Sequence, residues 1–231
     1  MSSITGQIKV VGIGAGGHAK ILVELLEQSE KYELAGFTDA QQERWGTEFM
    51  GYPVLGGDEV LPELHAKGIR AAFIGVGAVS GAGTRLRQKL FLQAVDLGFE
   101  MPTLIDRRAA VSPSASIGAG SIVMAGAVLS ADVRVGDNVV VYSGTLIEHD
   151  SVIENHVHMS PGVHLAGGVH IGEGTFIGIG ASIIHGIRVG TWTTIGAGTV
   201  VLKDLPDNVV AVGVPARPVR QIPNVAPGDR S

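Results

Sequence analysis

The chain has 231 residues, a formal net charge of −5 and no cysteine. The length allows one large domain or two small ones, and the acidic balance argues against a nucleic-acid or anionic-membrane partner. The lack of cysteine excludes disulfides, thiolate metal ligands and a cysteine nucleophile. No stretch approaches the ~18 apolar residues of a membrane span, and the first residues lack a basic leader, so we expect a cytoplasmic protein.

Strand and helix patterns alternate over the first hundred residues. The predicted strands are residues 8–14, 33–39, 71–77 and 99–106. The predicted helices are residues 18–30, with an apolar face at helical spacing, and residues 85–98, closed by Gly98. This alternation predicts a small parallel sheet with helices on its faces.

The stretch GIGAGGH, residues 12–18, follows the first predicted strand and opens the first helix. Backbone amides at such a helix start can bind a phosphate or a sugar hydroxyl. Asp39 ends the second strand, where a ribose or base contact is usual. A segment of this length is too short for a full dinucleotide fold, so a nucleotide-sugar is favoured over NAD. The alternative is a tight turn without a ligand.

From Val111 the pattern changes to a strict period of six. Every sixth residue from Val111 to Val201 is aliphatic or methionine, and a small or branched residue follows four positions later. Neither a helix nor an ordinary sheet has this period. A triangular solenoid does, because each hexapeptide forms one short face and one corner and three hexapeptides form a coil. The pattern predicts about five coils of parallel β-helix, capped by residues 207–223, where the period breaks. Such faces commonly pack as trimers, with clefts between neighbours.

Residues 146–172 hold five of the eight histidines. A three-histidine zinc site of the γ-class carbonic anhydrase type needs two histidines five residues apart, and no pair here has that spacing, so we expect no metal. His158, His164 and His170 each end a hexapeptide and lie on successive faces, which favours surface or interface positions for His164 and His170. His149 lies at a corner between Glu148 and Asp150, and His158 lies close enough along the solenoid for us to expect it to border the same cleft. A histidine beside a carboxylate is held in one tautomer and made more basic, as a general base requires.

The motifs GAGGHAK, GFTDA, FIGVG, IEHDSVI and GVPAR together resemble the left-handed β-helix acetyltransferases that modify bacterial surface sugars. The nearest are the nucleotide-activated 4-aminosugar N-acetyltransferases of the bacillosamine and perosamine type, and sialic acid O-acetyltransferases are close relatives. The resemblance implies an α/β fold with a small Rossmann-like parallel sheet domain followed by a left-handed parallel β-helix. The expected domains are residues 1–106 for nucleotide-sugar binding and 107–221 for acetyl transfer, including a C-terminal cap, with a tail at 222–231.

The resemblance also implies roles for residues of the solenoid. The family's catalytic histidine falls on His149 and its acidic helper on Asp150. Its acetyl-CoA-contacting histidine falls on His158, and a backbone amide near the thioester falls on Gly167. Further coenzyme contacts fall on Ile179 and Ala197, one coil of 18 residues apart.

In the first domain, the family's sugar-nucleotide loop falls on Gly16, Gly17 and His18, its strand-two acidic position on Asp39 and its strand-three turn on Gly77. The chain departs from the family pattern at two places in this pocket. Ala40 stands where a second carboxylate is frequent, and the loop AVSGAGTR, residues 78–85, stands where Asn-Asn is frequent. The identity of the nucleotide base therefore stays open.

The expected reaction is acetyl transfer from acetyl-CoA to the 4-amino group of a nucleotide-linked deoxyaminosugar by direct attack, catalysed by a homotrimer. His149 would accept the proton of the amine and Asp150 would orient the ring. One alternative is O-acetylation of a sugar such as sialic acid with the same residues, which would not require a nucleotide-binding domain. The other is a non-catalytic nucleotide-sugar-binding scaffold, which would not depend on the His–Asp pair.

Overall fold

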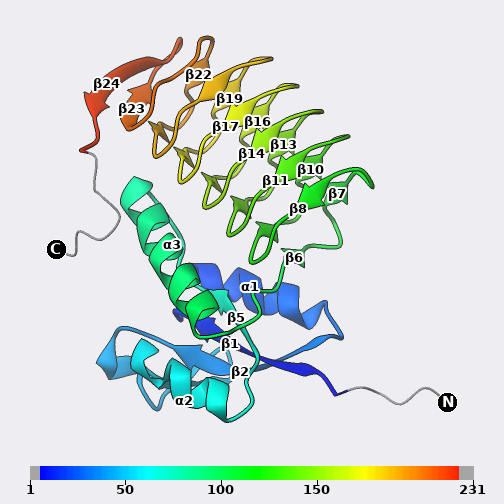
Figure 1. Ribbon diagram of the computed structural model, residues 1–231, viewed down its shortest axis with the longest axis vertical. Helices are drawn as coiled ribbons and strands as arrows, with labels where there is room; N and C mark the ends of the chain where they lie inside the picture. The colour runs from blue at the N-terminus through cyan, green and yellow to red at the C-terminus, as the bar shows by residue number, and fades with distance from the viewer. Residues whose placement is uncertain (1–5, 224–231) are drawn as a thin grey trace.

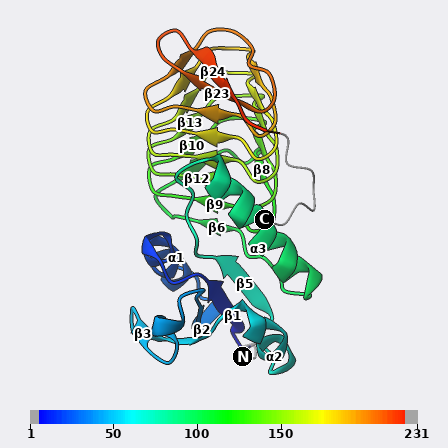
Figure 2. The same cartoon turned by 90° about the vertical axis from the view of Figure 1, so that its left-hand side faces the viewer.

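The computed structural model describes residues 6–223 and has two parts, an α/β domain and a triangular solenoid (Figures 1 and 2). The residues at 1–5 and 224–231 lie outside the described part, so the expected tail is described only at residues 222 and 223. None of the helices in residues 6–223 is both long and apolar enough to cross a bilayer.

The α/β domain is built on one five-stranded sheet in the order β3-β4-β2-β1-β5. Its parallel strands are β1 (Ile8–Ile13), β2 (Tyr32–Thr38), β4 (Tyr52–Gly56) and β5 (Ala71–Ile74), and β3 (Glu48–Phe49) is antiparallel. The helices are α1 (Gly17–Glu27), α2 (Leu61–Ala66) and α3 (Gly81–Asp96), with short 3-10 turns η1 (Gln42–Arg44) and η2 (Asp58–Val60). Strands β1 and β5 are buried over most of their length on both sides, which explains their continuous apolar sequence.

The predicted strands at 8–14, 33–39 and 71–77 and both predicted helices are confirmed. The β3–β4 hairpin and helix α2 were not predicted. The hairpin turns at Met50 and Gly51, which both adopt left-handed φ values of 53° and 80°, and its first strand has two residues, too few for a period-2 pattern. The predicted strand at 99–106 does not join this sheet as a strand. Glu100 forms an isolated bridge with Ala71, and residues 104–105 pair with the solenoid.

The solenoid consists of two-residue strands that pair in parallel with strands one coil away, which gives three flat sheets. The first face holds β7 (Ala110–Val111), β10 (Val128–Leu129), β13 (Leu146–Ile147), β16 (His164–Leu165), β19 (Ser182–Ile183) and β22 (Val200–Val201). The second face holds β8 (Ser116–Ile117), β11 (Arg134–Val135), β14 (Val152–Ile153), β17 (His170–Ile171) and β20 (Arg188–Val189).

The third face has eight strands and includes both ends of the solenoid. They are β6 (Leu104–Ile105), β9 (Ile122–Val123), β12 (Val140–Val141), β15 (His158–Met159), β18 (Phe176–Ile177), β21 (Thr194–Ile195), β23 (Val209–Val212) and β24 (Arg217–Gln221). Strand β24 turns back antiparallel to β23 and closes the last coil. The hydrogen bonding of the solenoid begins at Leu104, ahead of residue 107.

The period of six is confirmed by burial and by backbone geometry. The periodic aliphatic residues from Val123 to Val201 are all buried and form one continuous core. Three positions after each of these residues except Val201, the chain turns a corner in the left-handed region, with φ values of 60° at Asp150 and 66° at Gly168. Glycine adopts this region without strain and aspartate or asparagine with little, which explains why these residue types recur at the corners.

The α/β domain covers the third face. The outward side chains of this face from Ile122 through Phe176 are buried, and Ile122 and Val140 share a core cluster with Leu22 of α1. Helix α3 runs beside the coils, along the corner that joins the second and third faces (Figure 1). The corner between the first and second faces, called here the first corner, therefore lies on the opposite side of the prism from the α/β domain.

Candidate functional site

The first corner carries the predicted His–Asp pair. His149 Nδ1 lies 2.8 Å from Asp150 Oδ2. This hydrogen bond raises the pKa of His149 above its ordinary value, and with Nδ1–H donating to the carboxylate, Nε2 carries the free lone pair. Asp150 is also the corner residue, because its left-handed φ is tolerated by a short polar side chain. Both side chains are more than half exposed, so Nε2 is accessible to a substrate.

Gly167 lies one coil further along the same corner, directly beneath the ring of His149. A Cβ at position 167 would lie 2.6 Å from both Nε2 and Cε1 of His149. The next amide, Gly168 N–H, donates to the His149 carbonyl at 2.8 Å. Within residues 6–223 the Gly167 N–H itself has no acceptor. The structure thus brings together an accessible imidazole nitrogen and an unused backbone donor, the two groups that an acyl-transfer site requires.

His158 lies in a different environment. It is 2 % exposed on the third face, with its ring stacked on Phe176 at 5.3 Å and tilted against Tyr142 at 5.2 Å. Burial, and then the nearby charge of Arg87, lower the pKa of His158 to about 3. The sequence interpretation placed His158 and His149 on the border of one cleft. Within one chain the two residues lie on opposite sides of the prism, because His158 belongs to the third face and His149 lies at the corner opposite that face.

Ile179 and Ala197 lie one coil apart on the corner between the third and first faces, called here the third corner, and both are exposed. Their side chains therefore form a short surface strip that is separate from the His149 corner of the same chain.

The other histidines of the His-rich stretch have separate surroundings. His164 is exposed on the first face, and His156 is buried at a corner, where its Nδ1 lies 3.0 Å from Asn138 Nδ2. His170 lies on the second face, and its Nε2 is 2.7 Å from Glu154 Oε1.

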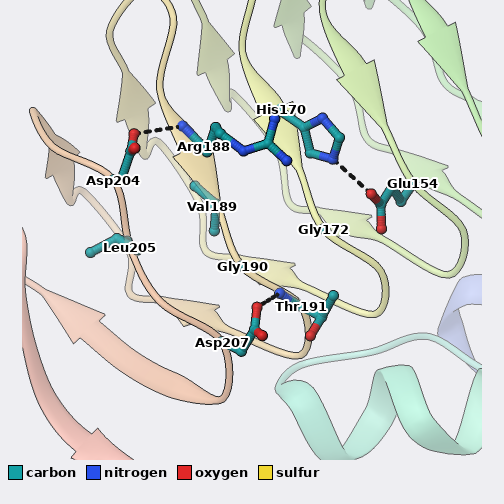
Figure 3. A pocket seen from close by; sticks show the side chains of 10 residues that line it. All are labelled: Glu154, His170, Gly172, Arg188, Val189, Gly190, Thr191, Asp204, Leu205 and Asp207. Atoms are coloured by element: carbon teal, nitrogen blue, oxygen red, sulfur yellow. Dashed lines mark hydrogen bonds and ion pairs between the residues drawn. The ribbon is translucent and has the colours of Figure 1, made fainter.

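A pocket of about 310 Å³ opens on the second face around His170 and Arg188 (Figure 3). Its carboxylates accept backbone hydrogen bonds that close the coils: Asp204 from Arg188 N–H at 2.9 Å and Asp207 from Thr191 N–H at 2.7 Å. Among residues 6–223 no group of three or more His, Cys, Asp or Glu side chains is arranged to hold a metal ion.

The predicted nucleotide loop lies at the carboxyl edge of the sheet in the α/β domain. Strands β2 and β5 flank β1 on its two sides, so the strand order reverses at β1. Open α/β sheets bind ligands at the carboxyl edge beside such a point. Gly16 and Gly17 have open space around their Cα atoms, and the N-terminus of α1 has no side-chain cap. Its free amides lie at this edge, beside the turn at residues 75–77, and suit a phosphate. The region outside this edge of the sheet is called here the nucleotide crevice.

His18 and Gly77 lie next to each other at this edge of the sheet. His18 is 7 % exposed; its Nδ1 lies 2.9 Å from Tyr142 Oη, and its Nε2 is buried without a hydrogen-bond partner. Burial, and then the charges of Arg87 and His158, hold the pKa of His18 well below its ordinary value. A Cβ on Gly77 would lie 3.2 Å from His18 Cβ and 3.8 Å from Tyr142 Oη. The crevice thus borders the third face of the solenoid.

Asp39 holds the glycine loop in place through hydrogen bonds. It is 8 % exposed, and its Oδ2 accepts Ala15 N–H at 2.9 Å while its Oδ1 accepts Gln41 N–H at 2.9 Å. Arg44 Nη1 lies 3.4 Å from the same carboxylate. Both carboxylate oxygens are therefore engaged within the chain, and Asp39 shapes the glycine loop whether or not it also meets a ribose.

Tyr142, Phe176 and Arg87 are residues of this region that the sequence interpretation missed. Tyr142 and Phe176 occupy outward positions of ordinary hexapeptides, and Arg87 lies in a helix with other basic residues. Their surroundings depend on the docking of the two domains, for which the sequence carries no local pattern.

Comparison with known proteins gives the same division of the chain. Residues 9–91 match the PglD N-terminal domain, and residues 114–149 and 168–203 match the bacterial transferase hexapeptide repeats. A histidine-to-alanine variant of GDP-perosamine N-acetyltransferase from Caulobacter crescentus, in complex with CoA and GDP-perosamine, is 40% identical and superposes with a TM-score of 0.85, covering 96% of this chain and 100% of that chain. The acetyltransferase domain of PglB from Neisseria gonorrhoeae, in complex with acetyl coenzyme A, is 39% identical with a TM-score of 0.83, covering 93% of this chain and 100% of that domain.

Curated relatives match over a shorter region. The galactoside O-acetyltransferase of Escherichia coli is 48% identical over 46 residues, which is 19% of this chain and 23% of that enzyme. The chain spans about a fifth of the length of the curated relatives that it matches.

Proposed function

The chain belongs to the left-handed β-helix nucleotide-sugar N-acetyltransferase family, and on this premise we propose that it transfers acetyl from acetyl-CoA to the 4-amino group of a nucleotide-linked sugar. The observation that carries the proposal is the ring of His149, hydrogen-bonded to Asp150 and lying against the unused amide of Gly167. The nucleotide loop at Gly16 and Gly17 supports a nucleotide-activated acceptor.

The proposed chemistry is direct attack. The sugar amine attacks the thioester carbonyl, a C–N bond forms, and His149 Nε2 removes the proton from the nitrogen, a step that contributes typically ~10²–10⁴-fold. Asp150 stabilises the resulting imidazolium through the Nδ1 bond. Gly167 N–H donates to the oxyanion of the tetrahedral intermediate. When the C–S bond breaks, the imidazolium returns its proton to the thiolate, and CoA leaves as the thiol.

We further propose that the working unit is a homotrimer. Within one chain the nucleotide crevice borders the third face, whereas His149 lies on the opposite corner. The amine of a nucleotide-sugar bound to one subunit must therefore be deprotonated by His149 of another subunit. The first face supports such contacts, because Leu146, Ile184 and Leu202 are exposed on it or at its edge. Side-by-side packing of the subunits would also bring His158, Ile179 and Ala197 of one subunit closer to the His149 corner of the next subunit, where they would contact the coenzyme. Light scattering should give three times the 23.9 kDa chain mass; a monomer would contradict the shared site.

We place the protein in the cytoplasm, where acetyl-CoA is made, and its product would supply surface-polysaccharide synthesis. The lack of cysteine agrees with a reducing compartment.

The decisive experiment is incubation with acetyl-CoA and a panel of GDP-, UDP- and dTDP-4-aminosugars, with thiol release as the readout. The perosamine relative suggests that the GDP-linked sugar will be the best substrate. Matched 4-hydroxy nucleotide sugars and free sialic acid are the controls for O-acetylation. Thiol release with these controls and not with the amines would favour an O-acetyltransferase, and binding without any release would favour a scaffold.

A further inference from the structure

Arg87 is a buried cation without a carboxylate partner. It lies in helix α3, is 2 % exposed, and no acidic side chain in residues 6–223 forms an ion pair with it. Burial lowers its pKa to about 10, so it remains charged near neutral pH. An unpaired buried charge costs stability. An arginine at this position therefore calls for an explanation other than stability.

The guanidinium joins the nucleotide crevice to the solenoid. Its Nη1 donates to the carbonyls of Ile74 at 3.1 Å and Val76 at 2.5 Å, at the end of β5. Its Nη2 donates to Asn138 Oδ1 at 3.0 Å. Asn138 is a corner residue of the solenoid, 1 % exposed and held in the left-handed region with a φ of 53°.

The turn held by Arg87 lies against the phosphate-binding loop with no free space between them. A Cβ on Gly14 would lie 2.6 Å from Val76 Cγ2, and a Cβ on Gly75 would collide with the Gly14 carbonyl. A movement of residues 75–77 must therefore displace residues 14–18 as well. Because interiors are close-packed, such a displacement is transmitted and not absorbed.

We propose that Arg87 is a positioning residue for the nucleotide-sugar, an inference that rests on the proposed function of the crevice. It holds the turn at 75–77, and through it the loop at 14–18, at one fixed distance from the solenoid, and its uncompensated charge attracts the anionic diphosphate. The same charge contributes to keeping the neighbouring His18 and His158 neutral.

The test compares Arg87→Met with Arg87→Lys and with a control on the same helix, Gln88→Met. Gln88 also joins α3 to the solenoid, with its Nε2 donating to Glu173 Oε1 at 3.0 Å, but it makes no bond to the turn at 75–77. Calorimetry with GDP and UDP measures nucleotide binding independently of acetyl transfer. Kinetics with the best aminosugar then separates KM from kcat, and thermal unfolding reports stability.

Arg87→Met should weaken nucleoside diphosphate binding and raise the KM for the nucleotide-sugar at least ~10-fold, with the KM for acetyl-CoA within twofold. Arg87→Lys should restore part of the binding because it keeps the charge, and Gln88→Met should bind like the parent. If Arg87→Met does not fold, a rise of at least ~5-fold in the KM for the nucleotide-sugar of Arg87→Lys supports the proposal. Nucleotide binding within twofold of the parent in the folded Arg87 variants, or equal losses for Gln88→Met and Arg87→Met, overturns it. Nucleotide binding without acetyl transfer by the parent would contradict the proposed function alone.

Discussion

The contact between Gly167 and His149 makes a sharp prediction for Gly167→Ala. The backbone of Gly167 is outside the left-handed region, so alanine introduces no backbone strain, and the Gly167 N–H donor is retained. The added Cβ would lie 2.6 Å from the Nε2 and Cε1 atoms of His149, whereas ordinary contact begins near 3.4 Å. The ring must therefore move by about 1 Å or break its bond to Asp150, and a misplacement of that size can cost ~10²-fold in rate.

The assay is steady-state thiol release with the preferred aminosugar. Gly167→Ala should lower kcat by about 10²-fold, equivalent to ~2.7 kcal/mol of activation free energy, while the melting temperature changes little because the site is exposed. In a His149→Asn background the same substitution should cost almost nothing further, since the displaced group is already inactive. A folded Gly167→Ala trimer with kcat within threefold of the parent would refute the placement of the base over Gly167.

Further predictions address the base, the glycine loop, the bystander histidines and metal. His149→Asn should lower kcat at least ~10²-fold with little change in KM, because a general base acts in the transition state; a loss below tenfold would place the base elsewhere. His149 acts as a base only when neutral, and its bond to Asp150 raises its pKa. The value of kcat/KM should therefore fall as the pH drops through a value above the ordinary ~6.5. Asp150→Asn should move this acidic fall to lower pH, and an unchanged profile would contradict the pairing. Asp39→Asn should raise the KM for the nucleotide-sugar and leave that for acetyl-CoA unchanged, because the carboxylate orders Ala15 of the loop; the reverse pattern would assign the wrong ligand to this domain. His170→Ala should stay within about threefold of the parent, since the His170 side chain pairs with Glu154 and not with the dyad; a larger loss would bring the second-face pocket into the mechanism. Treatment with a chelator should leave the activity unchanged, and stoichiometric zinc whose removal abolishes activity would overturn the acid–base mechanism.

The sequence predicted the solenoid well because its signal is local and repeated. Each hexapeptide must place one aliphatic residue inward and turn one corner, and these demands reappear every six residues from Val111 to Val201. The pairing of His149 with Asp150 was predictable for a related reason, because adjacent residues at a corner remain adjacent in any fold. Short elements were missed where the pattern is too brief, as in the β3–β4 hairpin and helix α2.

The sequence by itself thus determined the α/β domain, the coils, the corners and the His149–Asp150 pair, since periodicity and local sterics act between near neighbours. Only the tertiary structure decided the surroundings of His158, Asp39 and Arg87. The same outward hexapeptide position is exposed at His164 and buried at His158, because the α/β domain covers one face of the prism and not another. Which face is covered depends on contacts between residues far apart in the chain, such as that of Arg87 with Asn138, and no single segment encodes that choice.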